Sequence, residues 1–271
     1  KPKRRTRASA AREQGLQALA DLARGKLKAP FSDSSFLRLD PIKAAKLLVN
    51  DDKGIETPEQ ALAGAQDILA EEIMEDAVVR ERGRTHLRRR VRVVCKKRPG
   101  AQDLKQTFSH YYEFSKPLMH VRPHNALAIR RGVKAKVLSL KLEVEPNLEN
   151  SFLHSLLSDS LPAGAQHWKT VFEAAVTDGY SRLLFPALER EWWAEQLESA
   201  EIDAVEQFAV NLRAKLLQPP VKDVTVLAID PAHRTGCKVA VTSETGAVLA
   251  TAVVFPNKAK EALQTLERLL K

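Results

Sequence analysis

The chain has 271 residues, of which 44% are hydrophobic and 28% charged, so it can bury a core and is not disordered as a whole. No apolar run reaches the roughly 18 residues of a transmembrane helix, so we expect no membrane partner. The formal net charge of +9 favours a polyanionic partner, through phosphate contact and counterion release.

The first hundred residues predict a mainly helical region. One helix should begin at Pro58, because Thr57 can cap it, proline suits its first position, and Gln60 can reach back to the cap. The apolar residues at 87, 91 and 94 are spaced as on one helical face. They predict a second helix that ends before residue 99, with arginines around its exposed side: Arg88, Arg89, Arg90 and Arg92.

Residues 105–125 combine aromatic side chains with histidines. A platform for stacking bases is one interpretation of the aromatic residues. Core packing is the favoured one, because buried aromatic side chains supply much of the packing of a helical domain. Pro123 stands between His120 and His124, which argues against a metal held by one helix face. The residues concerned are Phe108, Tyr111, Tyr112, Phe114, His110, His120 and His124.

The rest of the chain changes its period twice. Residues 138–144 alternate as in a half-buried strand, and residues 165–217 return to a helical pattern with Pro186 as a break. Seven acids and one arginine between residues 189 and 206 are interpreted as a solvated helix face. After the Pro219-Pro220 pair, strands are predicted at 224–229, 238–242 and 247–255, followed by a helical tail at 263–270. Strand, strand, strand, helix, with Asp230 at the end of the first strand, is typical of the start of an RNase H-like domain.

Charges occur in blocks along the chain. Residues 1–30 contain nine Lys/Arg and two acids, whereas residues 51–79 contain nine acids and one lysine. Residues 80–105 contain eleven Lys/Arg and two acids, and residues 116–141 contain seven Lys/Arg and no acid. Such blocks predict basic faces, whose densest clusters are candidate phosphate contacts. These candidates are Lys3, Arg4, Arg5, Arg7, Arg88, Arg89, Arg90, Arg130 and Arg131.

Cys95 and Cys237 lie far apart and lack CxxC spacing, so we expect neither a zinc site nor another metal. A reducing compartment is favoured over a disulfide between them.

Several segments resemble the Tex family of transcription accessory proteins, and they occur in the family's order. They are KPKRRTRA from residue 1, AREQGL from 11, GAQDILAE from 64, YYEFSKPL from 111, HNALAIRRG from 124, DGYSRLL from 178, PALERE from 186, FAVNLR from 208, LLQPP from 216 and DPAHRTGCK from 230. The resemblance implies a fold that is mainly α with a C-terminal α/β part. Residues 1–220 would form a helical region with a short β element near 133–144, and residues 221–271 the first half of a YqgF, RNase H-like domain.

The resemblance also implies binding of RNA or DNA with little sequence preference, in association with transcription. Two alternatives stay open: a metal-dependent nuclease or resolvase acting through the YqgF-like domain, and a scaffold that contacts polymerase or ribosome. Catalysis is not expected, because Asp230 would need further carboxylates to hold two magnesium ions and these would lie beyond residue 271. Asp230 followed by Pro231 instead predicts a structural turn. We expect no cofactor, and a cytoplasmic location in a bacterium or a nuclear or organellar one in a eukaryote.

Overall fold

The computed structural model describes residues 5–31, 33–219, 221, 223–232 and 234–269. The chain divides into two compact units, Lys1–Gln207 and Phe208–Lys271, which we take in turn. The division falls inside a long helix that ends at Leu216. The domain boundary expected between residues 220 and 221 stays a prediction.

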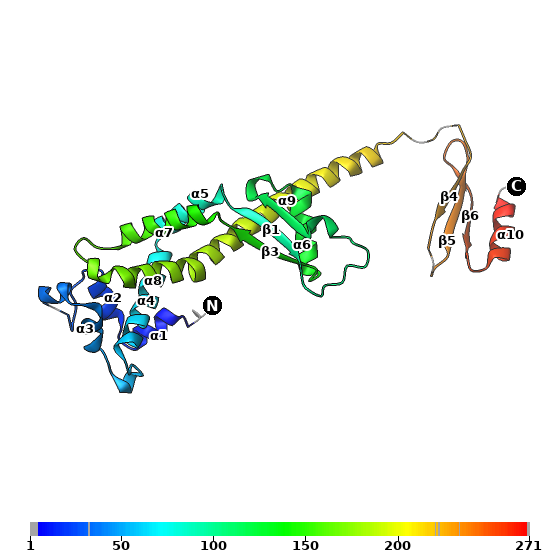
Figure 1. The fold of residues 1–271 in the computed structure, drawn as a ribbon. Coiled ribbons are helices and arrows are strands. Elements are labelled where there is room, and N and C mark those ends of the chain that lie inside the picture. The colour runs from blue at the N-terminus through cyan, green and yellow to red at the C-terminus, as the bar shows by residue number, and fades with distance from the viewer. Residues whose placement is uncertain (1–4, 32, 220, 222, 233, 270–271) are drawn as a thin grey trace. The chain divides into compact units, whose positions relative to one another are not determined.

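The first unit is mainly helical, as the sequence predicts. Helix α4 packs against α1, α3 and α8, so it is the central helix of this body (Figure 1). Short 3₁₀ turns lie at Ser34–Arg38, Asp51–Lys53, Ser109–Tyr111, Leu118–His120 and Gln166–Trp168. The α-helices are α1 (Arg7–Glu13), α2 (Gln17–Ala23), α3 (Pro41–Lys46), α4 (Pro58–Glu75), α5 (Ala77–Arg88), α6 (Pro123–Lys134), α7 (Pro146–Ser160), α8 (Lys169–Gly179) and α9 (Phe185–Leu216).

Helix α4 begins where the sequence predicts. Thr57 Oγ1 accepts a hydrogen bond from the backbone N–H of Gln60 at 3.3 Å, and Pro58 occupies the first turn. The Gln60 side chain reaches one residue beyond the cap, where its Oε1 accepts from the N–H of Glu56 at 2.8 Å. The helix start is therefore fixed by local hydrogen bonds that can be read from the sequence.

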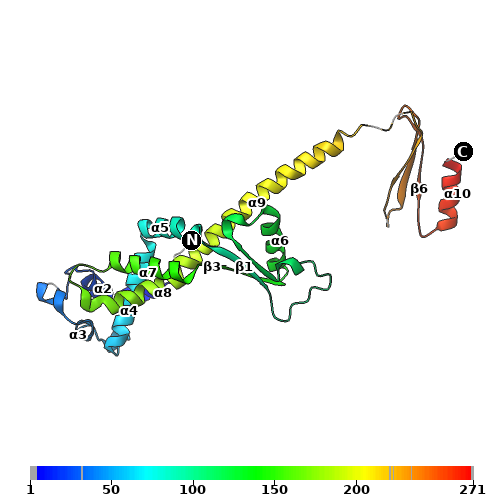
Figure 2. The ribbon, with the colours of Figure 1, turned by 45° about the horizontal axis from the view of Figure 1, so that its top comes forward.

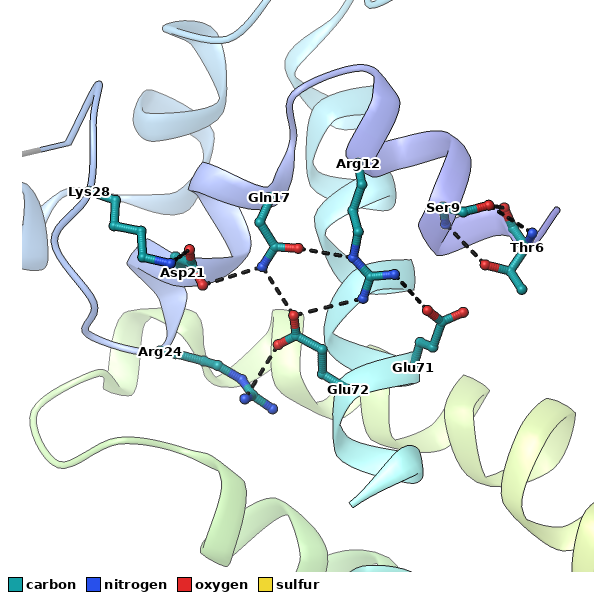
Figure 3. A network of polar contacts seen from close by, with 9 residues as sticks. All are labelled: Thr6, Ser9, Arg12, Gln17, Asp21, Arg24, Lys28, Glu71 and Glu72. Atoms are coloured by element: carbon teal, nitrogen blue, oxygen red, sulfur yellow. Dashed lines mark hydrogen bonds and ion pairs between the residues drawn. The ribbon is translucent and has the colours of Figure 1, made fainter. Parts of the chain in front are cut away.

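A polar network fastens α1 and α2 to α4 (Figure 3). Arg12 donates to Glu71 at 2.6 Å and lies 3.8 Å from Glu72. Glu72 also accepts from Gln17 Nε2 at 3.0 Å and pairs with Arg24 at 3.3 Å. Some basic residues of the first basic block therefore form ion pairs with acids of the block at residues 51–79.

The helix predicted through residue 94 is wrong beyond Arg88. Strand β1 (Arg92–Lys97) begins four residues later and forms the middle of an antiparallel sheet with β2 (Glu113–Pro117) and β3 (Leu138–Glu143), in the order β2-β1-β3. Val91, Val93 and Cys95 are buried while Arg92 is exposed, which is the period of two of a strand. β-Branched valines suit this half-buried surface better than they suit a helix. The strand predicted near residues 133–144 is confirmed as β3.

Residues 169–216 form one continuous helical stretch, which confirms the predicted helical pattern. Helix α8 passes into α9 through a π-helical turn, Tyr180–Leu184 (Figure 2). Pro186 therefore does not break the helix; it lies in the first turn of α9, where the π turn has already shifted the backbone hydrogen bonds. Leu188 and Trp192 of α9 are buried, whereas Phe208 is 65% exposed.

The second unit contains the predicted strands and helical tail. Its strands are β4 (Val226–Asp230), β5 (Cys237–Thr242) and β6 (Val248–Val254), antiparallel in the order β4-β5-β6, and they are followed by α10 (Ala259–Leu269). Helix α10 packs on β6, so that Val239 and Val254 are buried with Leu266 against them. Cys95 and Cys237 are both buried free thiols. Within the described residues, no helix is long and apolar enough to cross a membrane.

Candidate nucleic-acid interface

The predicted arginine cluster at residues 88–90 lies where α5 turns into β1. Arg88 ends the helix and pairs with Glu195 of α9 at 2.8 Å. Arg89 and Arg90 are exposed, and no ion pair joins them to another described residue. Two of the three charges therefore face solvent unpaired.

Arg130 and Arg131 lie on α6 and differ in the same way. Arg130 forms an ion pair with Glu201 of α9. Arg131 is exposed and makes no ion pair with a described residue, although its charge acts on Tyr111. Burial outweighs that charge and raises the pKa of the Tyr111 hydroxyl above its ordinary value. Arg131 is the available cation of this pair.

The acidic run on α9 is more than a solvated face, which corrects the interpretation of residues 189–206. Glu191 accepts from Arg84 at 2.5 Å, in addition to the ion pairs of Glu195 with Arg88 and of Glu201 with Arg130. The bonds to Glu191 and Glu81 raise the pKa of the Arg84 guanidinium above its ordinary value. Glu189 accepts the backbone N–H of Leu142 at 2.8 Å and so ties α9 to β3. Helix α9 is thus an acidic partner for α5 and α6.

The N-terminal cluster sits on another element. Arg5 pairs with Glu13 at 2.7 Å, with both side chains mostly exposed. Arg7 is the exposed first residue of α1, the helix that packs on α4. Lys3 and Arg4 lie outside the described residues. The first cluster therefore has a different packing partner from the clusters on α5 and α6.

The aromatic residues of 105–125 are largely structural. Phe114 is 8% exposed, and Tyr111 packs against the same core, with their ring centroids 5.5 Å apart. The hydroxyl of half-buried Tyr112 donates to Asp103 at 2.9 Å, and Lys97 Nζ lies 4.9 Å from its ring centroid. These contacts support core packing for Phe114 and Tyr111, rather than a platform for bases.

Asp230 is the last residue of β4, as the sequence predicts. Its partner in the sheet register is Lys238 of β5, so a cation stands beside the carboxylate. The hydrogen bonds expected for Asp230 in a turn stay a prediction. Among the residues that the structure describes, no three or more His, Cys, Asp or Glu side chains are grouped to hold a metal ion.

The basic clusters on α5 and α6 belong to one basic module, which we define as residues 88–141 and which contains β1, β2, α6 and most of β3. This module has fifteen Lys/Arg and two acids, Asp103 and Glu113. The arginine runs of this module are among the candidates predicted from the sequence, whereas its scattered lysines are not. The signal available in the sequence was the shortage of acids over the whole segment.

Comparison with known proteins agrees with this architecture. Residues 37–208 match the Tex central region-like family, and residues 224–271 match the Tex protein YqgF-like domain. Protein tex of Bordetella pertussis is 36% identical over 266 residues, which cover 94% of this chain and 32% of that protein. Transcriptional accessory protein Tex of Neisseria gonorrhoeae is 31% identical over 276 residues, which cover 100% of this chain and 34% of that protein. S1 RNA-binding domain-containing protein 1 of Homo sapiens is 30% identical over 261 residues, which cover 92% of this chain and 25% of that protein.

The chain therefore joins a helical central region to a YqgF-like α/β domain. It belongs to the Tex family, one of whose bacterial members is named transcriptional accessory protein Tex. It spans about a third of the length of the bacterial relatives it matches.

Proposed function

We propose that this chain is a nucleic-acid-binding accessory factor of transcription, which binds RNA or DNA with little sequence preference. The observation that carries the proposal is the basic module, with fifteen Lys/Arg against two acids. Contacts from such side chains to phosphates hold a nucleic acid without reading its bases. The names of the relatives, accessory to transcription in bacteria and RNA-binding in the human protein, support the same role. In a bacterial cell this role belongs to the cytoplasm.

The predicted contacts take different parts in this binding. Arg89, Arg90 and Arg131 are exposed and have no acidic partner among the described residues, so they can meet phosphate directly. Arg88 and Arg130 must first leave α9 glutamates. Those ion pairs are 38–53% exposed and worth about 0–1 kcal/mol each, so a phosphate can replace the glutamate at little cost.

The binding test is a titration with single-stranded RNA and with duplex DNA over a range of salt concentrations. Log affinity should fall linearly with log salt, by roughly 0.9 for each phosphate neutralised on duplex DNA and roughly 0.7 on a single strand. Absence of binding at low salt, or indifference to salt, would refute the proposal. That result would favour the alternative of a scaffold that contacts polymerase or ribosome through protein surfaces.

We further propose that the chain hydrolyses no phosphodiester bond. A two-metal nuclease site needs several carboxylates around the ions, and Asp230 has the cation Lys238 as its neighbour in the sheet. The assay is incubation with branched and linear DNA and RNA in magnesium or manganese. Metal-dependent cutting that disappears in Asp230→Asn would instead establish the nuclease alternative.

A further inference from the structure

Six basic side chains of the basic module lie where β1 ends, β3 begins and α6 ends, and a seventh, Lys105, stands in the loop between β1 and β2. All seven are exposed. Three chain segments that are separate in sequence supply them, residues 96–98, 105 and 131–136. We call this group the basic corner: Lys96, Lys97, Arg98, Lys105, Arg131, Lys134 and Lys136.

Hydrogen bonds hold the end of β1 against the end of α6 and the start of β3. The backbone N–H of Arg98 donates to Val137 O at 2.9 Å, and its side-chain Nε donates to Leu138 O at 2.9 Å. Val137 N in turn donates to Gly132 O at 3.0 Å at the end of α6. The loop reaches the same place, since a Cβ added at Gly132 would lie 3.2 Å from Phe108 Cδ1. These contacts fix the backbone that carries the cations of β1 and α6.

Two acids lie close to the corner. Glu113 of β2 is exposed and is the partner of Lys96 in the sheet register, and Asp103 lies in the loop between β1 and β2. The Asp103 carboxylate accepts from the backbone N–H of Thr107 at 3.0 Å, from that of Phe108 at 2.8 Å, and from the Tyr112 hydroxyl at 2.9 Å. These bonds, with the Phe108 amide first, hold the pKa of Asp103 below its ordinary value. Among the described residues no ion pair joins Asp103 to the corner, although the charge of Lys97 also lowers its pKa, so Arg131 and Lys134 are open to an outside partner.

Lys136 has a backbone conformation that is uncommon for a lysine. It has φ of +59°, the left-handed conformation at the end of α6. Its N–H donates to Val133 O at 3.0 Å while Val137 N reaches Gly132, which is the hydrogen-bond pattern of a helix end normally occupied by glycine. A lysine there is strained where glycine would not be. Gln106 and Asp223 also have positive φ, so the strain at Lys136 supports a use for its side chain only together with the cations around it.

We propose that the basic corner is the principal phosphate-binding surface of the chain, and that it takes the phosphodiester backbone of a nucleic acid independently of its bases. This inference rests on the proposed function. The main phosphate contacts would then lie on a surface that the fold assembles, and not on the arginine runs predicted from the sequence. Charge supports the proposal, because seven exposed cations are accompanied by two acids, the internally bonded Asp103 and Glu113 beside Lys96.

Basic residues at a helix C-terminus also stabilise the helix through its dipole, so the test must separate folding from binding. Lys136→Gly does so, because it relieves the strain while removing one cation. We expect thermal stability equal to or above that of the parent, and a roughly fivefold to tenfold loss of affinity near 0.1 M salt, the loss of about one phosphate contact. Lower stability with unchanged affinity would mean that the lysine serves the helix end, and would overturn the proposal.

The second variant replaces Lys105, Arg131 and Lys134 by glutamine. Its matched control replaces Lys43, Lys46 and Lys53, which are equally exposed on α3 and the turn after it, so that the net charge changes by the same amount. The corner variant should lose about two to three from the slope of log affinity against log salt, at roughly 0.7 per contact on single-stranded RNA and 0.9 on duplex DNA. The control should keep the parent slope.

The outcomes separate the corner from the proposed function. If the parent chain binds neither probe, the proposed function fails and the corner falls with it. If the parent binds but the corner variant and its control behave alike, the corner is wrong while nucleic-acid binding stands. A loss confined to one probe would identify RNA or duplex DNA as the source of the phosphates.

Discussion

The side chain of Cys95 is fully buried on the middle strand of the first sheet. This burial raises the pKa of its thiol to about 12. The thiolate is the reactive form, so the native thiol should be inert. Between the ordinary thiol pKa and 12, the Cys95 thiol ionises in the unfolded chain but not in the folded one. The stability of the protein therefore falls as pH rises through that range.

We therefore expect Cys95, in a Cys237→Ser background, to react with iodoacetamide at pH 8 no faster than the protein unfolds. Labelling followed by mass spectrometry, with and without denaturant, measures this. A labelling rate in native buffer close to the rate in denaturant would show that the thiol is accessible and the strand assignment wrong.

Gly132 has no room for a larger side chain, so its replacement should lower the stability of the protein. In α6 an alanine Cβ would lie 2.5 Å from Cδ1 and 2.8 Å from Cγ of Leu138, a fully buried side chain. Overpacking of this kind costs about 1–3 kcal/mol, more than the about 1 kcal/mol that alanine gains over glycine in a helix. Gly132→Ala should lower the free energy of unfolding in urea by about 1 kcal/mol. Unchanged or higher stability would mean that α6 can move away from β3.

At the element scale, glutamates of α9 hold two arginines of α5 and α6 that the proposed function assigns to phosphate contacts. Replacing Glu195 and Glu201 by glutamine frees Arg88 and Arg130 from their ion pairs. The slope of log affinity against log salt on duplex DNA should steepen by up to about 1.8, which is two phosphate contacts.

The matched control for that variant replaces Glu198 and Glu206, exposed residues of α9 with no ion pair to a described residue. It changes the net charge equally but frees no arginine, so its slope should equal that of the parent. Equal slopes for both variants would show that Arg88 and Arg130 do not touch phosphate.

The elements differ in how far the sequence could predict them. The start of α4 and the strands of the second unit are predictable, because caps and alternation act over a few residues. Strand β1 is not, because Val91 and Val94 fit helical spacing as well, and pairing with β2 and β3 decides the outcome. The ion pair of Arg84 with Glu191 spans 107 positions, and the basic corner joins three separate segments. The density of charged residues along the sequence could therefore reveal neither.

At the scale of the whole molecule, an exposed connection lies between the end of α9 and the start of β4. Leu217 and Val221 are 68% and 73% exposed, and Pro219 cannot continue the helix. Brief digestion with subtilisin should first cut between residues 217 and 225, because exposed connections between packed elements are the preferred sites of nicking. Mass spectrometry of the fragments identifies the position of the cleaved bond. Earlier cleavage inside the helical stretch 169–216 would contradict two separately packed units.

Strand β4 lies at the edge of its sheet among the described residues, and its side chains include Val226 and Ile229, 36% and 53% exposed. An edge of this kind offers unpaired amides and carbonyls to any strand that approaches it. At high concentration we expect two copies of the chain to join edge to edge and to extend one sheet into the next. Light scattering should then rise with concentration, and a charge introduced by Ile229→Lys should suppress the rise. The same edge that leaves this sheet open to extension makes the purified chain prone to self-association.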